Sequence, residues 1–246
     1  MEKSEYFNTD ASTLFKVKKI QIQMLKDRGY DVTDEMEVLT MGIEQFIKRY
    51  MEKKKTVKPE KKMEVSFKSV LQQEYINPNI SVDNNNKIFI FYPETPVEKK
   101  KIGKETANQI ISVMNSNKYI HVIIISEMDF TPDAKKSFLD LKLYHIEHFL
   151  YNQLSYNPTN HFLVPKHRLM SDEESKAFTI KNNIDRHTLP KISHQDPISK
   201  YYGATPGQIF EITRERVIID APISVYIIHR LVESVELEAG KEEKKG

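Results

Sequence analysis

The 246-residue sequence contains no cysteine, only seven glycines and no long apolar run. Without cysteine there are no disulfides, thiolate zinc sites or cysteine nucleophiles, which suits a reducing intracellular compartment. Sparse glycine leaves no phosphate-binding loop, because the closely spaced pair Gly203 and Gly207 has no lysine following it. The longest apolar run, near 120–126, is far shorter than the ~20 residues that span a bilayer. We therefore expect a soluble protein with no membrane contact, no cofactor and no small-molecule substrate.

The charge is nearly balanced, with 37 basic and 35 acidic side chains and a net charge of +2. A protein that binds nucleic acid by itself usually carries a larger basic excess. Any contact with DNA or RNA is therefore expected to be one part of a larger surface. The lysine-rich run at 53–62 is interpreted as a solvated loop, with a nucleic-acid or localisation patch as the alternative.

Hydrophobic spacing predicts an α/β protein, α+β overall, that begins with a helical hairpin. Helical spacing over 5–28 stops at Gly29, and a second helix is predicted with Thr33 as its N-cap. Short apolar runs then predict buried strands that alternate with helices, as in a βαβ unit. These strands are expected at 87–92 and 119–125, and the helices at 104–114 and 131–141.

The composition changes after 157–160, which predicts a second, smaller α+β domain. Ser171-Asp-Glu-Glu174 has the spacing of a capping box and opens a helix to about Lys181. Alternating residues at 208–213 and 224–232 predict two strands of a small sheet. The charged end of the chain is predicted to be disordered. The predicted domains are 1–155 and 156–232, followed by the tail 233–246.

One motif resembles the site of a magnesium-dependent nuclease. In such enzymes two carboxylates hold the ion and a lysine supports the attacking water, and Asp133, Asp140 and Lys142 have that order here. However, 131–141 is predicted to be one helix, and a seven-residue separation places the two carboxylates ~10 Å apart along its axis. A solvated helix face is the preferred interpretation, so we assign no catalytic residue and no metal site.

The eight histidines form no recognisable metal-binding set. His145 and His148 are three residues apart, which suits a shared metal only on a helix, and no further ligand follows at a suitable spacing. His161 and His167 flank Leu163-Val-Pro165 and are expected to fix an irregular segment through hydrogen bonds. All eight are interpreted as structural histidines.

Several motifs in the second half of the chain carry a specific resemblance. They are His161-Phe-Leu-Val-Pro-Lys-His167, Leu189-Pro-Lys-Ile192, Asp196-Pro197, Tyr201-Tyr-Gly203 and Pro206-Gly-Gln208. Their order and spacing resemble the RNA polymerase subunit called H in archaea, which is the fifth shared subunit of eukaryotic nuclear polymerases. The first half resembles the eukaryotic form through Asp27-Arg-Gly-Tyr30, Phe91-Tyr-Pro-Glu94, Thr131-Pro-Asp-Ala-Lys135 and Glu147-His-Phe149.

The resemblance implies a non-catalytic subunit of a DNA-directed RNA polymerase, because the active site of that enzyme belongs to its large subunits. It implies an N-terminal jaw domain near downstream duplex DNA and a C-terminal assembly domain on the largest subunit. The DNA-facing residues would be Thr131, Pro132, Ala134 and Lys135, with weak contacts to the DNA backbone. The assembly interface would comprise His161, Leu163, Val164, Pro165, His167, Asp196, Pro197, Tyr201, Gly203, Gly207, Arg214, Tyr226 and Arg230.

The sequence departs from the family pattern between Arg214 and Tyr226, where Glu215 to Ser224 is longer and lacks glycine. This departure puts in doubt the contacts that the family makes from that loop. It also suggests a divergent lineage, either a fast-evolving eukaryote or a large DNA virus with its own polymerase. The expected location is the nucleus in the first case, and the virion or cytoplasmic viral factory in the second. The alternative functions are a magnesium-dependent nuclease and a free-standing transcription adaptor.

Overall fold

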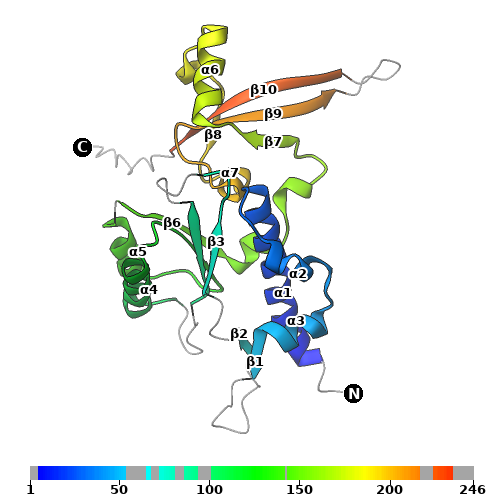
Figure 1. Cartoon of the computed structure of the whole chain (residues 1–246), viewed down its shortest axis with the longest axis vertical. Coiled ribbons are helices and arrows are strands. Elements are labelled where there is room, and N and C mark those ends of the chain that lie inside the picture. Colours follow the sequence, from blue (N-terminus) through cyan, green and yellow to red (C-terminus); the bar gives the residue numbers. More distant parts are fainter. Residues whose placement is uncertain are drawn as a thin grey trace, which may run out of the picture. The chain divides into compact units, whose positions relative to one another are not determined.

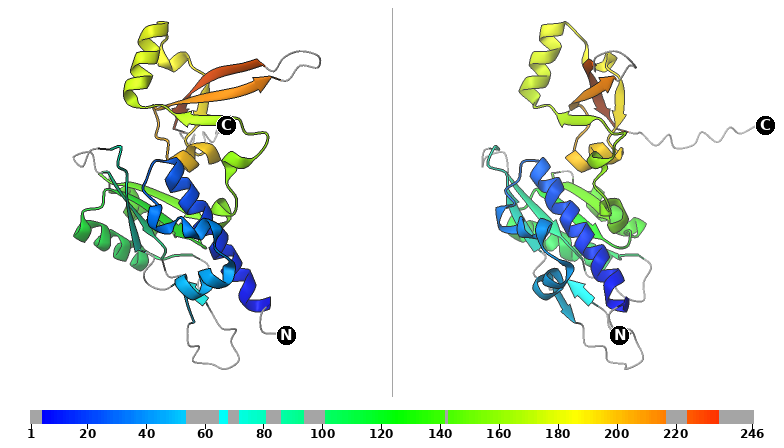
Figure 2. Two further views of the ribbon diagram at one scale, coloured as in Figure 1. Left: turned by 45° about the vertical axis from the view of Figure 1, so that its right-hand side comes forward. Right: turned by 90° about the vertical axis from the view of Figure 1, so that its right-hand side faces the viewer.

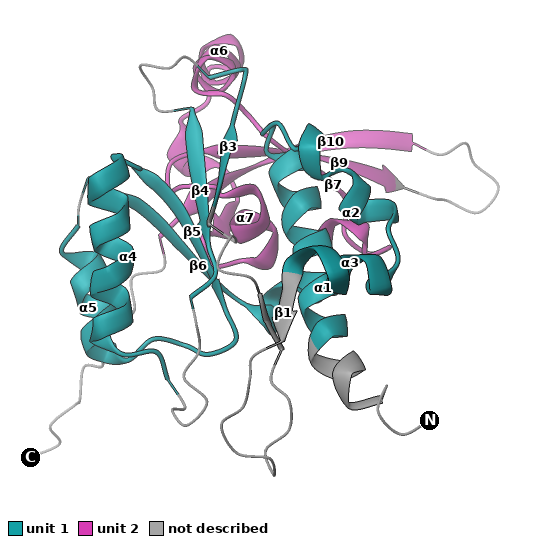
Figure 3. Cartoon of the chain, turned by 60° about the horizontal axis from the view of Figure 1, so that its bottom comes forward, with its two compact units in different colours: residues 1–157 teal, residues 158–246 magenta. Residues whose placement is uncertain are grey.

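The structure is a computed structural model that describes residues 5–53, 65–67, 72–80, 86–93, 101–141, 143–216 and 224–234. The chain forms two compact units, an N-terminal unit (residues 1–157) and a C-terminal unit (residues 158–246), which Figure 3 colours separately. Helices and mixed sheets together confirm the predicted α+β class. Among the described helices, none combines the length and the apolar character that a membrane crossing needs. The predicted 53–62 loop and the tail lie almost wholly outside the described residues.

The first helix, α1 (Glu5–Asp27), ends where the sequence predicts. The N–H of Tyr30 donates to the carbonyl of Leu25, and the N–H of Gly29 donates to that of Lys26, both at 2.9 Å. This pair of bonds is a Schellman motif, which requires a left-handed residue at its turn. Gly29 supplies it with φ of 86°.

The predicted second helix is interrupted. It consists of η1 (Thr33–Glu35), α2 (Glu37–Thr40) and α3 (Ile43–Tyr50). The prediction that Thr33 is an N-cap is wrong, because the Asp31 carboxylate accepts hydrogen bonds from both the N–H and the hydroxyl of Thr33. Thr33 therefore lies inside a short 3-10 turn. The hairpin nevertheless forms, with the rings of Phe15 and Phe46 5.0 Å apart.

A four-stranded sheet follows the hairpin, in the order β3-β4-β5-β6. Its strands are β3 (Gln72–Ile76), β4 (Lys87–Phe91), β5 (His121–Ser126) and β6 (His145–Leu150). The pairs β4–β5 and β5–β6 are parallel, and they are joined through α4 (Lys104–Asn117) and α5 (Pro132–Leu139). The predicted βαβ unit is confirmed, with a second one after it. The antiparallel strand β3 and the two-stranded ribbon of β1 (Met51–Lys53) and β2 (Val65–Phe67) were not predicted.

Helices cover both faces of this sheet (Figures 1 and 2). On one face, α4 and α5 pack with Ile110 and Ala134 against Phe89 and Val122 to form the apolar core of the unit. On the other face lies α1, and the strand residues that point to this side include the fully buried Ile90 and Ile123. Alternate residues of each strand point to opposite faces, so neighbouring strand residues serve the two layers.

The C-terminal unit contains a second four-stranded sheet in the order β7-β9-β10-β8. The strands are β7 (Lys166–Leu169), β8 (Lys191–Ser193), β9 (Ile209–Arg216) and β10 (Ser224–Glu233), and the helical segments are η4 (Pro158–Asn160), α6 (Asp172–Asn182), η5 (Arg186–Thr188) and α7 (Pro197–Tyr202). The capping box predicted at Ser171 and Glu174 is present at the start of α6. The two predicted strands are β9 and β10, whereas the short strands β7 and β8 were not predicted.

Each face of this second sheet packs against one helix. Phe178 of α6 packs with Ile209 and Leu231 on one face. Tyr202 of α7 lies 5.8 Å from the ring of Phe210 on the other. The antiparallel pair β9–β10 continues beyond the end of β7, because β7 pairs only with residues 210–213 of β9 (Figure 1).

Candidate interaction surfaces

The N-terminus of α5 has the local structure that the sequence predicts. Thr131 is the N-cap, and its hydroxyl accepts a hydrogen bond from the N–H of Ala134 at 3.3 Å. Pro132 occupies the first helical position, where a missing N–H costs nothing. The side chain of Ala134 is fully buried in the apolar core. Ala134 therefore supports the turn and has no side-chain surface to offer to DNA.

The charges around this helix terminus are already compensated. Lys135 makes an ion pair of 2.5 Å with Asp129, and Asp133 lies in the first turn. Burial alone would raise the pKa of Asp129, but its bond with Lys135 lowers it. An anion approaching this end of α5 would meet two carboxylates as well as one lysine. Any contact with DNA phosphate here is therefore expected to be weak.

The nuclease-like motif is not assembled into an ion site. Asp133 lies in the first turn of α5, and Asp140 follows the last residue of the same helix. The predicted single helix is thus confirmed, and it holds the two carboxylates at opposite ends.

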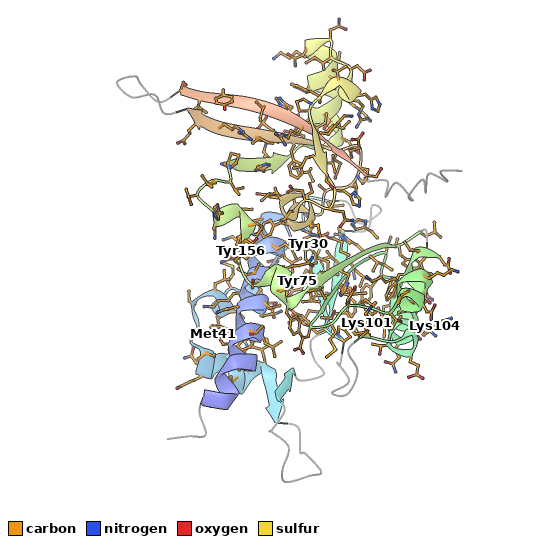
Figure 4. The ribbon with its side chains drawn as sticks, turned by 180° about the vertical axis from the view of Figure 1, so that it is seen from behind. Tyr30, Met41, Tyr75, Lys101, Lys104 and Tyr156 are labelled. Atoms are coloured by element: carbon orange, nitrogen blue, oxygen red, sulfur yellow. The ribbon has the colours of Figure 1, made fainter. Side chains whose placement is uncertain are left out.

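A buried cluster of charged groups lies between α1 and the sheet. Arg28 donates from Nη1 and Nη2 to the two carboxylate oxygens of Glu147 at 2.7 and 2.8 Å. His121 Nε2 lies 2.8 Å from the same carboxylate, and His145 Nε2 lies at 3.6 Å. Tyr30 is 3.3 Å from the other ring nitrogen of His121, and Figure 4 shows it on the α1 side of the sheet.

The contact with Arg28 shows whether this cluster is a structural ion pair or a metal site. Burial alone would raise the pKa of Glu147, but the charge of Arg28 and the hydrogen bonds hold it well below the usual range. Burial lowers the pKa of His121 despite the neighbouring carboxylate. Although His121, His145 and Glu147 are spaced closely enough for a cation, both carboxylate oxygens already accept from Arg28. The geometry is that of a structural ion pair.

His145 and His148 do not act together. They lie on strand β6, where a three-residue separation directs them to opposite faces of the sheet. His148 Nε2 is 2.7 Å from the Ser126 hydroxyl, and its Nδ1 is 3.6 Å from Asp129. Both histidines thus have structural partners.

A second buried ion pair holds α1 to the hairpin and the sheet. Lys18 Nζ lies 2.9 Å from a carboxylate oxygen of Glu35, and Gln21, Gln73 and Tyr75 complete the hydrogen bonding. Burial lowers the pKa of Lys18 to about 8, although Glu35 opposes this effect. Sequence analysis missed this network, because Lys18 is 17 residues from Glu35 and 57 from Tyr75 and none of these residues belongs to a recognisable motif.

In the C-terminal unit, five of the predicted interface residues shape the domain itself. Asp196 caps α7 by accepting from the N–H of Ile198 at 2.8 Å, and Pro197 follows as the first helical residue. Tyr201 is buried. The glycines provide left-handed turns, with φ of 64° at Gly203 and 95° at Gly207.

The segment 161–167 is fixed by its histidines, as the sequence predicts. The N–H of Leu163 donates to the ring of His161 at 3.3 Å, and the N–H of Val164 donates to the His161 carbonyl at 2.8 Å. His167 Nδ1 lies 2.7 Å from the Pro165 carbonyl, so this nitrogen carries a proton and donates. The segment holds its side chains outward, with Leu163 72% exposed.

The last three predicted residues lie on the long strand pair. Arg214 of β9 is directly opposite Tyr226 of β10, and Arg230 lies four residues further along β10. Tyr226 is 45% exposed. Several other apolar side chains in this unit are also exposed, and the sequence analysis did not select them. Exposed apolar residues of this kind indicate an interaction surface. They are Phe162, Val225 and Ile227.

These features define a two-unit binding protein in which the described polar groups mostly serve the fold. Comparison with known proteins gives the family. The family model for RNA polymerase Rpb5, N-terminal domain, matches residues 8–114, and that for RNA polymerase Rpb5, C-terminal domain, matches residues 156–232. The chain belongs to the Rpb5 family of DNA-directed RNA polymerase subunits, and it is a non-catalytic subunit that has the polymerase complex as its partner.

Curated relatives agree over nearly the whole chain. The DNA-directed RNA polymerases I, II, and III subunit RPABC1 of Caenorhabditis briggsae is 31% identical over 220 residues, which cover 89% of this chain and 95% of the relative. The DNA-directed RNA polymerase subunit 5-like protein 1 of Arabidopsis thaliana is 30% identical over 207 residues, covering 83% and 90%. The RPABC1 subunit of Dictyostelium discoideum is 27% identical over 208 residues, covering 83% and 91%.

Proposed function

We propose that the chain anchors to the largest polymerase subunit through its C-terminal unit, while its N-terminal unit forms part of the jaw beside downstream duplex DNA. The observation that carries the first half is the group of apolar side chains that the C-terminal unit leaves in solvent. Phe162 is 88% exposed and Leu163 is 72% exposed, next to a segment that its own hydrogen bonds hold rigid. Rigid, exposed apolar groups of this kind favour protein docking.

The DNA-facing role is the weaker half of the proposal. Thr131 and Pro132 begin a helix whose N-terminus favours anions. Lys135 is engaged with Asp129, and Asp133 adds a further negative charge. We infer that this end of α5 positions DNA through backbone contacts without reading its sequence.

Substitution of the exposed apolar pair tests the anchoring. In the full-length chain, Phe162→Ser with Leu163→Ser is expected to weaken binding to the largest subunit by about tenfold or more. Ile180→Ser is the matched control, because Ile180 is 80% exposed on α6 of the same unit. The dissociation constant is measured on immobilised subunit. Equal binding by the double variant and the control would contradict anchoring through this segment.

Fractionation of a native extract separates a polymerase subunit from a free-standing adaptor. A subunit elutes in size-exclusion chromatography with a very large complex that carries polymerase activity, whereas an adaptor elutes mostly alone. For a cellular protein of this family we infer a nuclear location, because the polymerases of the eukaryotic relatives are the enzymes that it would join.

A further inference from the structure

On one face of the C-terminal sheet, Arg214 and Arg230 each have a buried nitrogen for which the described residues supply no hydrogen-bond acceptor. Arg230 is opposite Phe210, and Arg214 is opposite Tyr226, so alternation of the strands directs both arginines to the face that carries Phe210. The Nε atoms of Arg214 and Arg230 are shielded from solvent and have no hydrogen-bond partner in the part of the chain that the structure describes. A buried donor without an acceptor is costly, and more so when it carries a charge.

His167 adds a third basic group to the same place. It lies on β7 opposite Ile212, beside the two arginines. Burial lowers the pKa of His167, while the Pro165 carbonyl and Asp196 oppose that change and the charges of both arginines reinforce it. The carboxylate of Asp196 acts on His167, and its Oδ1 already accepts a hydrogen bond from the N–H of Ile198 in α7. The local charge is therefore positive and incompletely neutralised.

The arginine on the other face of the same sheet, in contrast, has acceptors within the chain. There, Arg168 donates to Glu174 and Glu211 at 2.8 to 3.1 Å, so one guanidinium has two carboxylate partners. In the N-terminal unit Arg28 has Glu147 as its partner. Among the described arginines, Arg214 and Arg230 therefore differ in having a buried nitrogen that donates to no described residue. An acceptor from outside the chain fits this arrangement.

The surroundings favour a protein carboxylate over a nucleic-acid phosphate. Tyr226, which faces the same side as the arginines, is 45% exposed. An exposed tyrosine beside arginine side chains is typical of a protein interface, in which both residue types are enriched. The planar guanidinium also matches the two oxygens of a carboxylate.

We propose that Arg214 and Arg230 receive an aspartate or glutamate side chain of the largest polymerase subunit, which completes the hydrogen bonding of both guanidinium groups on docking. This inference deepens the proposed anchoring and rests on it. It adds the chemical identity of the group recognised: an acidic side chain that becomes desolvated between two arginines. His167, held by the Pro165 carbonyl, forms the edge of the site nearest to β7.

The test compares variants of the full-length chain on immobilised largest subunit. The double variant Arg214→Gln with Arg230→Gln is expected to raise Kd about 30-fold or more, mainly through faster dissociation. The double lysine variant should fall between it and the unaltered chain, because lysine supplies charge without the planar fork. Arg168→Gln is the matched control, since it removes the same charge from the opposite face and should leave Kd unchanged.

The melting temperature of the free chain separates docking from a structural role. Because the two Nε atoms have no hydrogen-bond partner among the described residues, the glutamine double variant should melt at the same temperature as the unaltered chain or higher. A clear fall in melting temperature would show an internal role and overturn the inference. A loss of affinity for a duplex DNA probe, with subunit binding retained, would assign the site to phosphate and also overturn it.

The outcomes distinguish the two proposals. If the unaltered chain binds the subunit and the glutamine double variant binds equally well, the carboxylate site is wrong while anchoring stands. If the unaltered chain fails to bind the largest subunit, the anchoring itself is wrong, and the inference about its acidic contact is overturned with it.

Discussion

Replacing Arg28 by methionine removes the charge that neutralises Glu147 inside the N-terminal unit. The two side chains are only 4% and 12% exposed, and they form two parallel hydrogen bonds. After the substitution, Glu147 keeps its contacts with His121 and His145, which lie at 2.8 and 3.6 Å. Methionine fills most of the volume of the arginine side chain, so the change chiefly removes charge and hydrogen bonds.

The expected loss is about 3–5 kcal/mol, the usual cost of leaving one member of a buried ion pair uncompensated. For a chain of this size that loss corresponds to a fall of roughly 6–20 °C in melting temperature. Arg49→Met is the comparison, because the pair of Arg49 with Glu37 is 48% and 75% exposed. Removal of an exposed pair of this kind costs about 0–1 kcal/mol.

Urea unfolding followed by circular dichroism measures both losses, and hydrogen exchange of β5 and β6 localises them to the N-terminal unit. A second signature is the dependence on pH. Without Arg28, burial raises the pKa of Glu147, so this carboxyl takes up a proton and the difference from the unaltered chain shrinks as the pH falls. Equal losses for Arg28→Met and Arg49→Met at neutral pH would refute the reasoning.

Two further changes test the same unit. Gly29→Ala is expected to cost about 1–2 kcal/mol, because φ is +86° and the added Cβ would lie 3.3 Å from the Asn77 side chain; Gly103→Ala, with open space around it, should stay within about 0.5 kcal/mol. Unfolding midpoints that do not differ would contradict this. The stability of the unaltered chain should decrease as the pH falls below about 6.5, because burial lowers the pKa of folded His121 and the unfolded chain binds the proton first. A further decrease should follow below about pH 4.3, where the unfolded chain protonates Glu147 before the folded one does. His121→Gln should flatten the upper part of the profile in urea titrations at successive pH values, and an unchanged profile would assign it to another group.

The features that the sequence predicted are those whose cause lies within a few residues. The Gly29 stop, the Thr131 cap and the Ser171–Glu174 capping box each depend on bonds that span one turn of chain. The strands β4, β5, β9 and β10 were predicted because their apolar or alternating residues are visible in a short window. The boundaries differ by only a few residues, as expected for ends that fray.

The predictions that were wrong or missing depend on contacts that the local pattern does not contain. Thr33 has the residue type and neighbours of an N-cap, but Asp31 satisfies its N–H and hydroxyl first. Strands β7 and β8 contain four and three residues, too few for a periodic signal. The contact of Arg28 with Glu147 joins residues 119 positions apart, and only the parallel register of β5 and β6 brings His121 and His145 beside them.

The way in which charge is neutralised differs between the buried ion pairs of the N-terminal unit and the arginines of the proposed docking site. Lys18 and Arg28 are buried, and each has a carboxylate partner in the same unit, so their charges serve the folded state alone. Arg214 and Arg230 share part of that burial, but each has a buried Nε with no hydrogen-bond partner among the described residues. A residue that only stabilised the fold would be better replaced by a neutral side chain, because an unpaired buried charge opposes folding. In the proposed docking, a partner that supplies the acceptor offsets this cost, so the two arginines would mark the assembly surface more specifically than exposed apolar residues do.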